Sequence, residues 1–127
     1  MNKTNFQPTV LIADDEPRIV EVIQRFLTRQ GYESTTASNG REALGKSKAQ
    51  KPDVILLDIT MPELDGFTVC KKLREDPATR LIPVIMLTSG DPSDPEYQKN
   101  DLQPDVFVAK SAEMQPLLRK VRSLLQR

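Results

Sequence analysis

The feature that most constrains the fold is a run of four apolar residues, 54–57, that leads directly into the carboxylate of Asp58. The run is too short for a helix, and a continuous apolar run of this length is typical of a strand buried on both faces. A charge at the point where a buried strand surfaces is costly unless another group pairs with it. The sequence therefore predicts a buried strand and a partner for Asp58.

Other short runs have the same form, and they also end on polar side chains. A further strand, residues 32–37, is rich in threonine and poor in large apolar residues, which an edge strand tolerates. The apolar strands, each with the polar side chains at its carboxyl end, are residues 9–13 with Asp14 and Asp15, residues 54–57 with Asp58, residues 83–88 with Thr88, and residues 105–109 with Lys110.

Segments with helical spacing of apolar residues separate these strands. Pro17 suits the first turn of the first helix, and Gly31 fits the position just past its end. We expect Asp94 to cap a short fourth helix, and Pro116 is tolerable in the last helix only within its first turn. The predicted helices span residues 17–30, 41–50, 67–74, 95–102 and 114–125.

Five strands that alternate with five helices are typical of an α/β fold with a parallel sheet and helices on both faces. The most apolar early strands, 9–13 and 54–57, are the natural central pair, and the polar strand 32–37 belongs at an edge. This arrangement gives the strand order 2-1-3-4-5. No repeat or change in composition marks a second domain, so we expect a tail at residues 1–8 and one domain at residues 9–127.

The polar side chains gather at one edge of this predicted sheet, because the carboxyl ends of parallel strands lie at the same edge. In such sheets ligands bind beyond these carboxyl ends, at the point where the strand order reverses. Carboxylates at such density are the ligands that Mg²⁺ prefers, together with waters and a phosphate oxygen. An aspartate carboxylate can form an acyl phosphate, and a lysine and a hydroxyl can offset the charge of the phosphoryl group. The residues alone therefore predict a metal-dependent phospho-acceptor, built from Asp14, Asp15, Asp58, Thr88 and Lys110.

Composition excludes several other kinds of site. The chain has no histidine and a single cysteine, Cys70, which excludes histidine-based catalysis, an internal disulfide and a cysteine-based zinc site. Cys70 has the spacing of a small core residue on a helix. The 18 basic and 18 acidic residues balance, so we expect no direct binding of nucleic acid or membrane. No signal peptide or membrane span is recognisable, and we expect a cytoplasmic location.

The polar strand ends belong to a wider set of residues, which is Asp14-Asp15, Asp58, Met61-Pro62, Asp65-Gly66, Thr88, Phe107 and Lys110. On these residues, and over essentially its whole length, the chain resembles the receiver domain of two-component response regulators, which has a flavodoxin-like, doubly wound fold.

The resemblance implies a role for each matching acidic residue. Asp58 would be the phosphorylation site, and Asp15 and Asp58 would be direct Mg²⁺ ligands. Asp14 would hold the metal directly or through water, and the backbone carbonyl of Thr60 would be a further ligand.

The resemblance also implies a switch and its partners. Thr88 and Lys110 would contact the phosphoryl group, and Thr88 and Phe107 would change arrangement on activation. The donor would be a phosphohistidine on a histidine kinase or a phosphotransfer protein. An output protein or fused output domain would bind the face made by the fourth helix, the fifth strand and the fifth helix, and phosphorylation-dependent homodimers are a further option. The chain would catalyse only its own phosphorylation and dephosphorylation.

Each residue taken alone has an ordinary explanation. An acidic pair such as Asp14-Asp15 can cap a helix, a lysine at a strand end is commonly solvated, and Phe107 can be a core aromatic. The joint placement at the ends of different strands favours the functional interpretation.

Two alternative functions stay open. A degenerate receiver that docks to partners without phosphorylation is suggested by Ser111, where the family usually has proline, and by the Pro-rich residues 91–104. A phosphatase with an aspartate nucleophile is disfavoured, because Thr60 stands where such enzymes have a second acid. No Gly-rich phosphate-binding loop is present, which excludes a P-loop enzyme.

Overall fold

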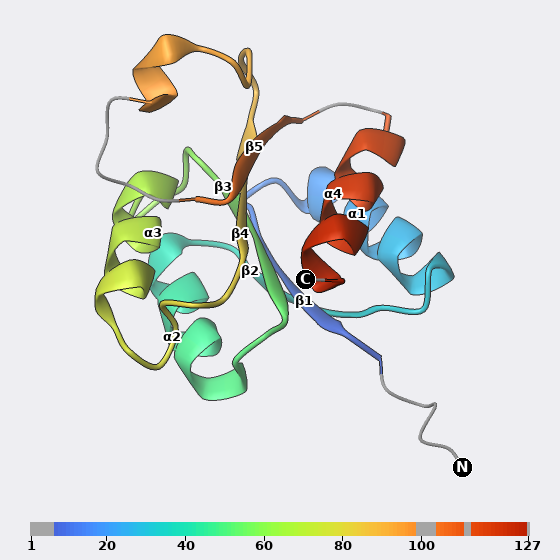
Figure 1. The fold of residues 1–127 in the computed structure, drawn as a ribbon, viewed down its shortest axis with the longest axis horizontal. Helices are drawn as coiled ribbons and strands as arrows, with labels where there is room; N and C mark the ends of the chain where they lie inside the picture. The colour runs from blue at the N-terminus through green and yellow to red at the C-terminus, as the bar shows by residue number, and fades with distance from the viewer. Residues whose placement is uncertain (1–6, 99–103, 111–112, 127) are drawn as a thin grey trace.

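The computed structural model describes residues 7–98, 104–110 and 113–126. One sheet of five parallel strands, in the order β2-β1-β3-β4-β5, carries helices on both faces (Figure 1), which confirms the predicted architecture. None of the helices described combines the length and apolar character that crossing a membrane requires. The strands are β1 (Thr9–Ala13), β2 (Glu33–Ala37), β3 (Val54–Asp58), β4 (Val84–Thr88) and β5 (Val106–Ala109). The helices are α1 (Pro17–Arg29), α2 (Gly40–Gln50), α3 (Gly66–Glu75), α4 (Gln115–Leu125) and the 3-10 helix η2 (Pro95–Gln98).

The sheet separates two apolar cores. On one face α1 and α4 cover strand side chains such as Leu56, and on the other face α2 and α3 cover side chains such as Leu57 (Figure 1). Cys70 is buried in the second core, as predicted. All residues of β3 and β4 are buried, whereas β2 buries only Ala37 and lies at an edge. Burial on both faces explains the continuous apolar runs.

The strands pair in a register that aligns their carboxyl ends. Ala13 of β1 lies beside Leu57 of β3, and Thr88 of β4 lies beside Ala109 of β5. The residues that end or follow four different strands therefore meet at one edge of the sheet. Asp58 occupies the middle of that edge, since β3 is the central strand.

Local sequence explains the helix ends. Pro17 is the first residue of α1, and Gly31 follows this helix with a φ of 88°, a conformation that favours glycine. Asn39 caps α2 by accepting a hydrogen bond of 2.8 Å from the Glu42 N–H. Pro116 is the second residue of α4 and so lies in the first turn, as expected.

The predicted fourth helix, residues 95–102, differs from the structure. Its described part forms the 3-10 helix η2 rather than an α-helix, and residues 99–103 lie outside the described residues. Asp94 starts this turn as predicted: its carbonyl accepts a hydrogen bond from the Tyr97 N–H at 3.0 Å and its side chain accepts one from the Glu96 N–H at 2.9 Å. Each proline lacks a backbone N–H donor and disfavours the α-helical conformation of the residue before it. A segment rich in proline therefore forms a short turn rather than a long helix.

Gly66 begins α3 against the backbone that follows β3. Its N–H donates to the Ile59 carbonyl at 2.7 Å, and a Cβ at this position would lie 2.9 Å from the Ile59 Cα. We expect Gly66→Ala to lower the free energy of unfolding by about 1 to 2 kcal/mol, because the loop after Asp58 must shift. Gly45→Ala in α2, where a Cβ meets open space, should instead raise it by about 0.5 to 1 kcal/mol. Urea denaturation measures both, and changes of the same sign would contradict this account.

Candidate functional site

Asp58 ends β3 with a side chain that is only 7% exposed. Its Oδ2 lies 3.3 Å from the Lys110 Nζ, and its Oδ1 accepts a hydrogen bond of 3.3 Å from the Thr60 N–H. Burial raises the pKa of Asp58 to about 6; the charge of Asp14 adds to the rise and Lys110 opposes it. The Asp58 anion is therefore destabilised by its surroundings, and a further cation would stabilise it.

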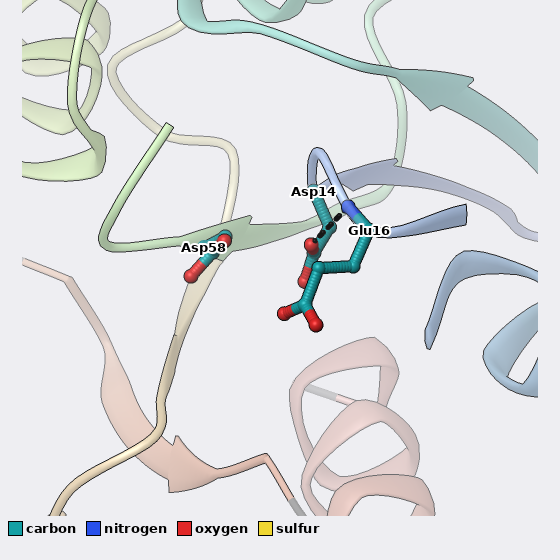
Figure 2. Close-up of side chains that lie close together, drawn as sticks. All are labelled: Asp14, Glu16 and Asp58. Carbon is teal, nitrogen blue, oxygen red and sulfur yellow. Dashed lines mark hydrogen bonds between the residues drawn. The ribbon is translucent and has the colours of Figure 1, made fainter. Parts of the chain in front are cut away.

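Two further carboxylates turn toward the same space as Asp58 (Figure 2). Asp14 follows β1 and is buried, and its Oδ1 accepts a hydrogen bond of 2.9 Å from the Glu16 N–H. One oxygen from each of Asp14, Glu16 and Asp58 lies within 4.8 Å of the others. Like charges at this spacing repel one another, so the group requires a cation.

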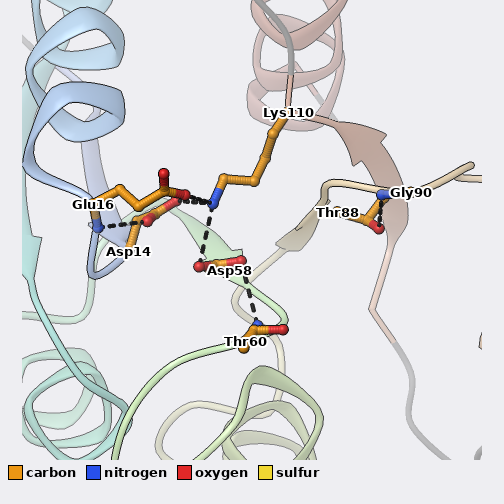
Figure 3. A network of polar contacts seen from close by, with 7 residues as sticks. All are labelled: Asp14, Glu16, Asp58, Thr60, Thr88, Gly90 and Lys110. Atoms are coloured by element: carbon orange, nitrogen blue, oxygen red, sulfur yellow. Dashed lines mark hydrogen bonds and ion pairs between the residues drawn. The ribbon is translucent and has the colours of Figure 1, made fainter.

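Lys110 supplies the positive charge that the described residues place among these carboxylates (Figure 3). Its Nζ lies 2.6 Å from Glu16 Oε1, 3.0 Å from Asp14 Oδ2 and 3.3 Å from Asp58 Oδ2. Burial by itself lowers the pKa of Lys110, but the hydrogen bonds with Glu16 and Asp14 and the charges of Asp14 and Asp58 outweigh it, and the net direction is upward. The ammonium is therefore charged at neutral pH. Ser111 lies outside the described residues.

Glu16 is the acidic residue that sequence reasoning missed. It stands at the N-terminus of α1 but makes no capping hydrogen bond with its side chain, which reaches Lys110 instead. Asp15, predicted as a direct metal ligand, is exposed and is not part of the three-carboxylate group. The signal for Glu16 in the sequence is that it extends the Asp14-Asp15 pair to a run of three consecutive acids. The metal-binding roles of Asp15 and of the exposed Thr60 stay predictions.

Thr88 ends β4 and is buried at the same edge of the sheet. Its hydroxyl accepts a hydrogen bond of 2.9 Å from the Gly90 N–H and points toward Gly90 rather than toward Asp58 (Figure 3). It also lies 2.6 Å from the Tyr97 hydroxyl. The structure thus brings Thr88 to the site but engages its hydroxyl elsewhere.

Phe107 is a half-buried residue of β5 that packs against the core under α2 and α3. Its ring stacks on the Tyr97 ring, with centroids 4.8 Å apart and an angle of 14° between the planes. A third ring, that of Phe67, lies 6.3 Å from Phe107. Phe107 is therefore a core aromatic in this structure, and its role in a switch stays a prediction.

The donor set fits a hard divalent cation. Carboxylate oxygens of three residues converge, and oxygen ligands of this kind are those that Mg²⁺ takes. The buried Oδ2 of Asp14 faces the Lys110 ammonium at 3.0 Å but accepts no hydrogen bond that meets geometric criteria from the described residues. A buried carboxylate oxygen with spare accepting capacity beside Asp58 is the kind of atom that a metal ion would coordinate.

The sequence of residues 10–122 matches the response regulator receiver domain family. The chain belongs to this family. Over 118 residues the receiver domain is 38% identical to the alkaline phosphatase synthesis transcriptional regulatory protein PhoP of Bacillus subtilis, an alignment that covers 93% of this chain and 48% of PhoP. It is 40% identical over 115 residues to the response regulator PleD of Caulobacter vibrioides, covering 91% of this chain and 25% of PleD. The chain thus spans half or less of these relatives, and the predicted domain boundaries at residues 9–127 stay predictions.

Solved structures agree with this assignment. The Francisella response regulator 1452 receiver domain superposes with a TM-score of 0.85 at 31% identity, over 95% of this chain and 98% of that one. The response regulator TrrA of Thermotoga maritima, solved in complex with Mg²⁺ and BeF, gives a TM-score of 0.83 at 34% identity, over 93% and 99% of the two chains. The predicted phospho-acceptor class is confirmed, since the acidic pocket fits a receiver's Mg²⁺ site, and the unphosphorylated docking module is not favoured.

Proposed function

We propose that Asp58 of this receiver domain accepts a phosphoryl group from the phosphohistidine of a histidine kinase or phosphotransfer protein. The observation that carries the proposal is the buried carboxylate of Asp58 at the open edge of the sheet, 3.3 Å from Lys110. A carboxylate oxygen forms the new bond to phosphorus, and the bond from phosphorus to the donor's imidazole nitrogen breaks. That nitrogen keeps the electron pair and takes a proton.

The proposed metal ligands are Asp14, Asp15, Asp58 and the backbone carbonyl of Thr60, with Glu16 as a further acid within reach. Mg²⁺ bound there would offset the negative charge of the phosphoryl oxygens.

Two groups of the chain itself would contact the phosphoryl group. Lys110 already faces Asp58, so its ammonium meets the phosphoryl oxygens with little movement. Thr88 would donate its hydroxyl, which requires the hydroxyl to turn from its present partners.

Phosphorylation would change the affinity of the receiver domain for an output protein or a fused output domain. The proposed surface is the face formed by η2, β5 and α4, with Thr88 and Phe107 as the switch residues. The same face could join two phosphorylated copies of the chain. We further propose that the protein acts in the cytoplasm, binds no nucleic acid directly because its charges balance, and catalyses only its own phosphorylation and dephosphorylation.

Intact-mass measurement tests the phosphorylation site. Incubation with Mg²⁺ and a small phosphodonor such as acetyl phosphate should add the mass of one phosphoryl group, labile to base, and Asp58→Asn should add none. Asp76→Asn, at the carboxyl end of α3, is the matched control and should be phosphorylated like the unchanged protein. Removal of Mg²⁺ by a chelator should abolish the gain. A gain that persists in Asp58→Asn, or no gain in the unchanged protein, would contradict the proposal.

A further inference from the structure

The hydroxyl of Thr88 is held by a side chain from outside the acidic pocket. Its Oγ1 lies 2.6 Å from the hydroxyl of Tyr97, which belongs to η2, and it accepts a 2.9 Å hydrogen bond from the Gly90 N–H. Thr88 is 2% exposed, so its hydroxyl makes its hydrogen bonds with these two protein groups rather than with water. Either hydroxyl can be the donor in the first contact.

Tyr97 is itself fixed by aromatic neighbours. Its ring stacks on Phe107 of β5 at 4.8 Å and lies tilted against Phe67 of α3 at 6.1 Å. Of these three rings only that of Tyr97 carries a hydroxyl, so it alone can form a hydrogen bond with Thr88. The cluster therefore sets where the Tyr97 hydroxyl lies, and through it where the Thr88 hydroxyl points.

This contact opposes the role proposed for Thr88. The hydroxyl points toward Gly90 and away from Asp58 (Figure 3). A threonine side chain occupies one staggered rotamer at a time, so turning its hydroxyl toward a phosphoryl group on Asp58 breaks the contact with Tyr97. The break occurs whichever of the two atoms is the donor.

We propose that Tyr97 is a positioning residue that holds the Thr88 hydroxyl away from the phospho-acceptor in the unphosphorylated protein and releases it when Asp58 is phosphorylated. The inference rests on the proposed function, since it needs Thr88 to contact the phosphoryl group. Release removes the hydrogen bond that links η2 to the end of β4. Phosphorylation of Asp58 would therefore change, through Thr88, the contacts that hold Tyr97 in its stack with Phe107.

A double-mutant cycle tests this coupling, with the phosphoryl analogue beryllofluoride and Mg²⁺ as the probe. Tyr97→Phe removes the hydroxyl and keeps the ring, and Thr88→Val removes the other hydroxyl at constant shape. Losing one competing hydrogen bond should tighten beryllofluoride binding in Tyr97→Phe by about two- to ten-fold. The same change made in the Thr88→Val background should leave the affinity unaltered. An equal gain in both backgrounds, or no gain in either, would overturn the proposal.

A measurement on the free protein needs no ligand. The Thr88 side chain should occupy one χ1 rotamer in the unchanged protein and average over several in Tyr97→Phe, as judged from its NMR scalar couplings. Tyr32→Phe, which alters the chain's other tyrosine outside this cluster, is the control and should leave the rotamer unchanged. An unaltered Thr88 rotamer in Tyr97→Phe would overturn the proposal.

Failure of the two proposals can be told apart. If the unchanged protein binds beryllofluoride no better than Asp58→Asn, the proposed phosphorylation site is wrong. If binding depends on Asp58 but the cycle shows no coupling between Tyr97 and Thr88, the site stands and the positioning role is wrong.

Discussion

Lys110→Met is expected to lower the free energy of unfolding by about 3 kcal/mol at pH 7 in metal-free buffer, because it removes one partner of a buried ion pair. The Lys110 side chain is 10% exposed and lies within 3.3 Å of two buried carboxylates, Asp14 and Asp58. Methionine keeps most of the aliphatic volume but leaves these charges facing each other. Urea denaturation in the presence of a chelator measures the loss.

A lysine in an exposed ion pair is the matched control. Lys48 lies 3.6 Å from Asp76 with a side chain that is 58% exposed, so Lys48→Met should change stability by no more than about 0.5 kcal/mol. Mg²⁺ should stabilise Lys110→Met more than the unchanged protein, since the metal would supply the missing positive charge. Equal losses in the two variants would show that the contacts of Lys110 contribute little to stability.

Asp58→Asn is expected to raise the free energy of unfolding at pH 7 by up to about 3 kcal/mol, the equivalent of a pKa shift of roughly two units. The pKa of Asp58 rises from 3.8 to about 6 on folding, chiefly through burial, so the folded protein binds this proton more tightly than the unfolded chain does. The proton therefore stabilises the fold below about pH 4, and that contribution is lost as the pH rises through about 6. Asparagine is neutral throughout and avoids the loss.

The gain should therefore depend on pH. Unfolding free energies of Asp58→Asn and the unchanged protein, measured with a chelator, should converge between pH 6 and pH 4 and differ most above pH 6. Glu21→Gln removes an exposed charge that pairs with Arg25 on α1, and it should show a difference below about 0.5 kcal/mol. A gain in Asp58→Asn that is the same at pH 4 and pH 7 would mean that burial of the charge is not its cause.

The positions of the strands could be predicted because parallel strands buried on both faces leave a continuous apolar run in the sequence. Residues 54–57 and 83–88 are of this kind, and β3 and β4 lie there with every residue buried. The polar composition of residues 32–37 likewise placed β2 at the edge. The site followed from the fold, since Asp14, Asp58, Thr88 and Lys110 end or follow four of these strands.

What sequence reasoning missed depends on side-chain direction and on loops. Adjacent acids look alike in a sequence, yet Asp14 is buried beside Asp58 whereas Asp15 is exposed. Glu16 is a long, exposed residue at a helix start, and its contact with Lys110 spans 94 positions of sequence. Tyr97 contacts Thr88 from the 3-10 helix η2, in a segment for which the sequence predicted an α-helix.

The sheet separates the aromatic cluster of Tyr97, Phe107 and Phe67 from the core under α1 and α4. Phe67 and Phe107, which contact Tyr97, pack against the core under α2 and α3, whereas the core under α1 and α4 shares none of these rings. A rearrangement of the rings can therefore proceed on one side of the partition while the other layer keeps its packing. On the proposed function, a partner that contacts both η2 and α4 would bridge one element that belongs to the ring cluster and one that packs in the separate core.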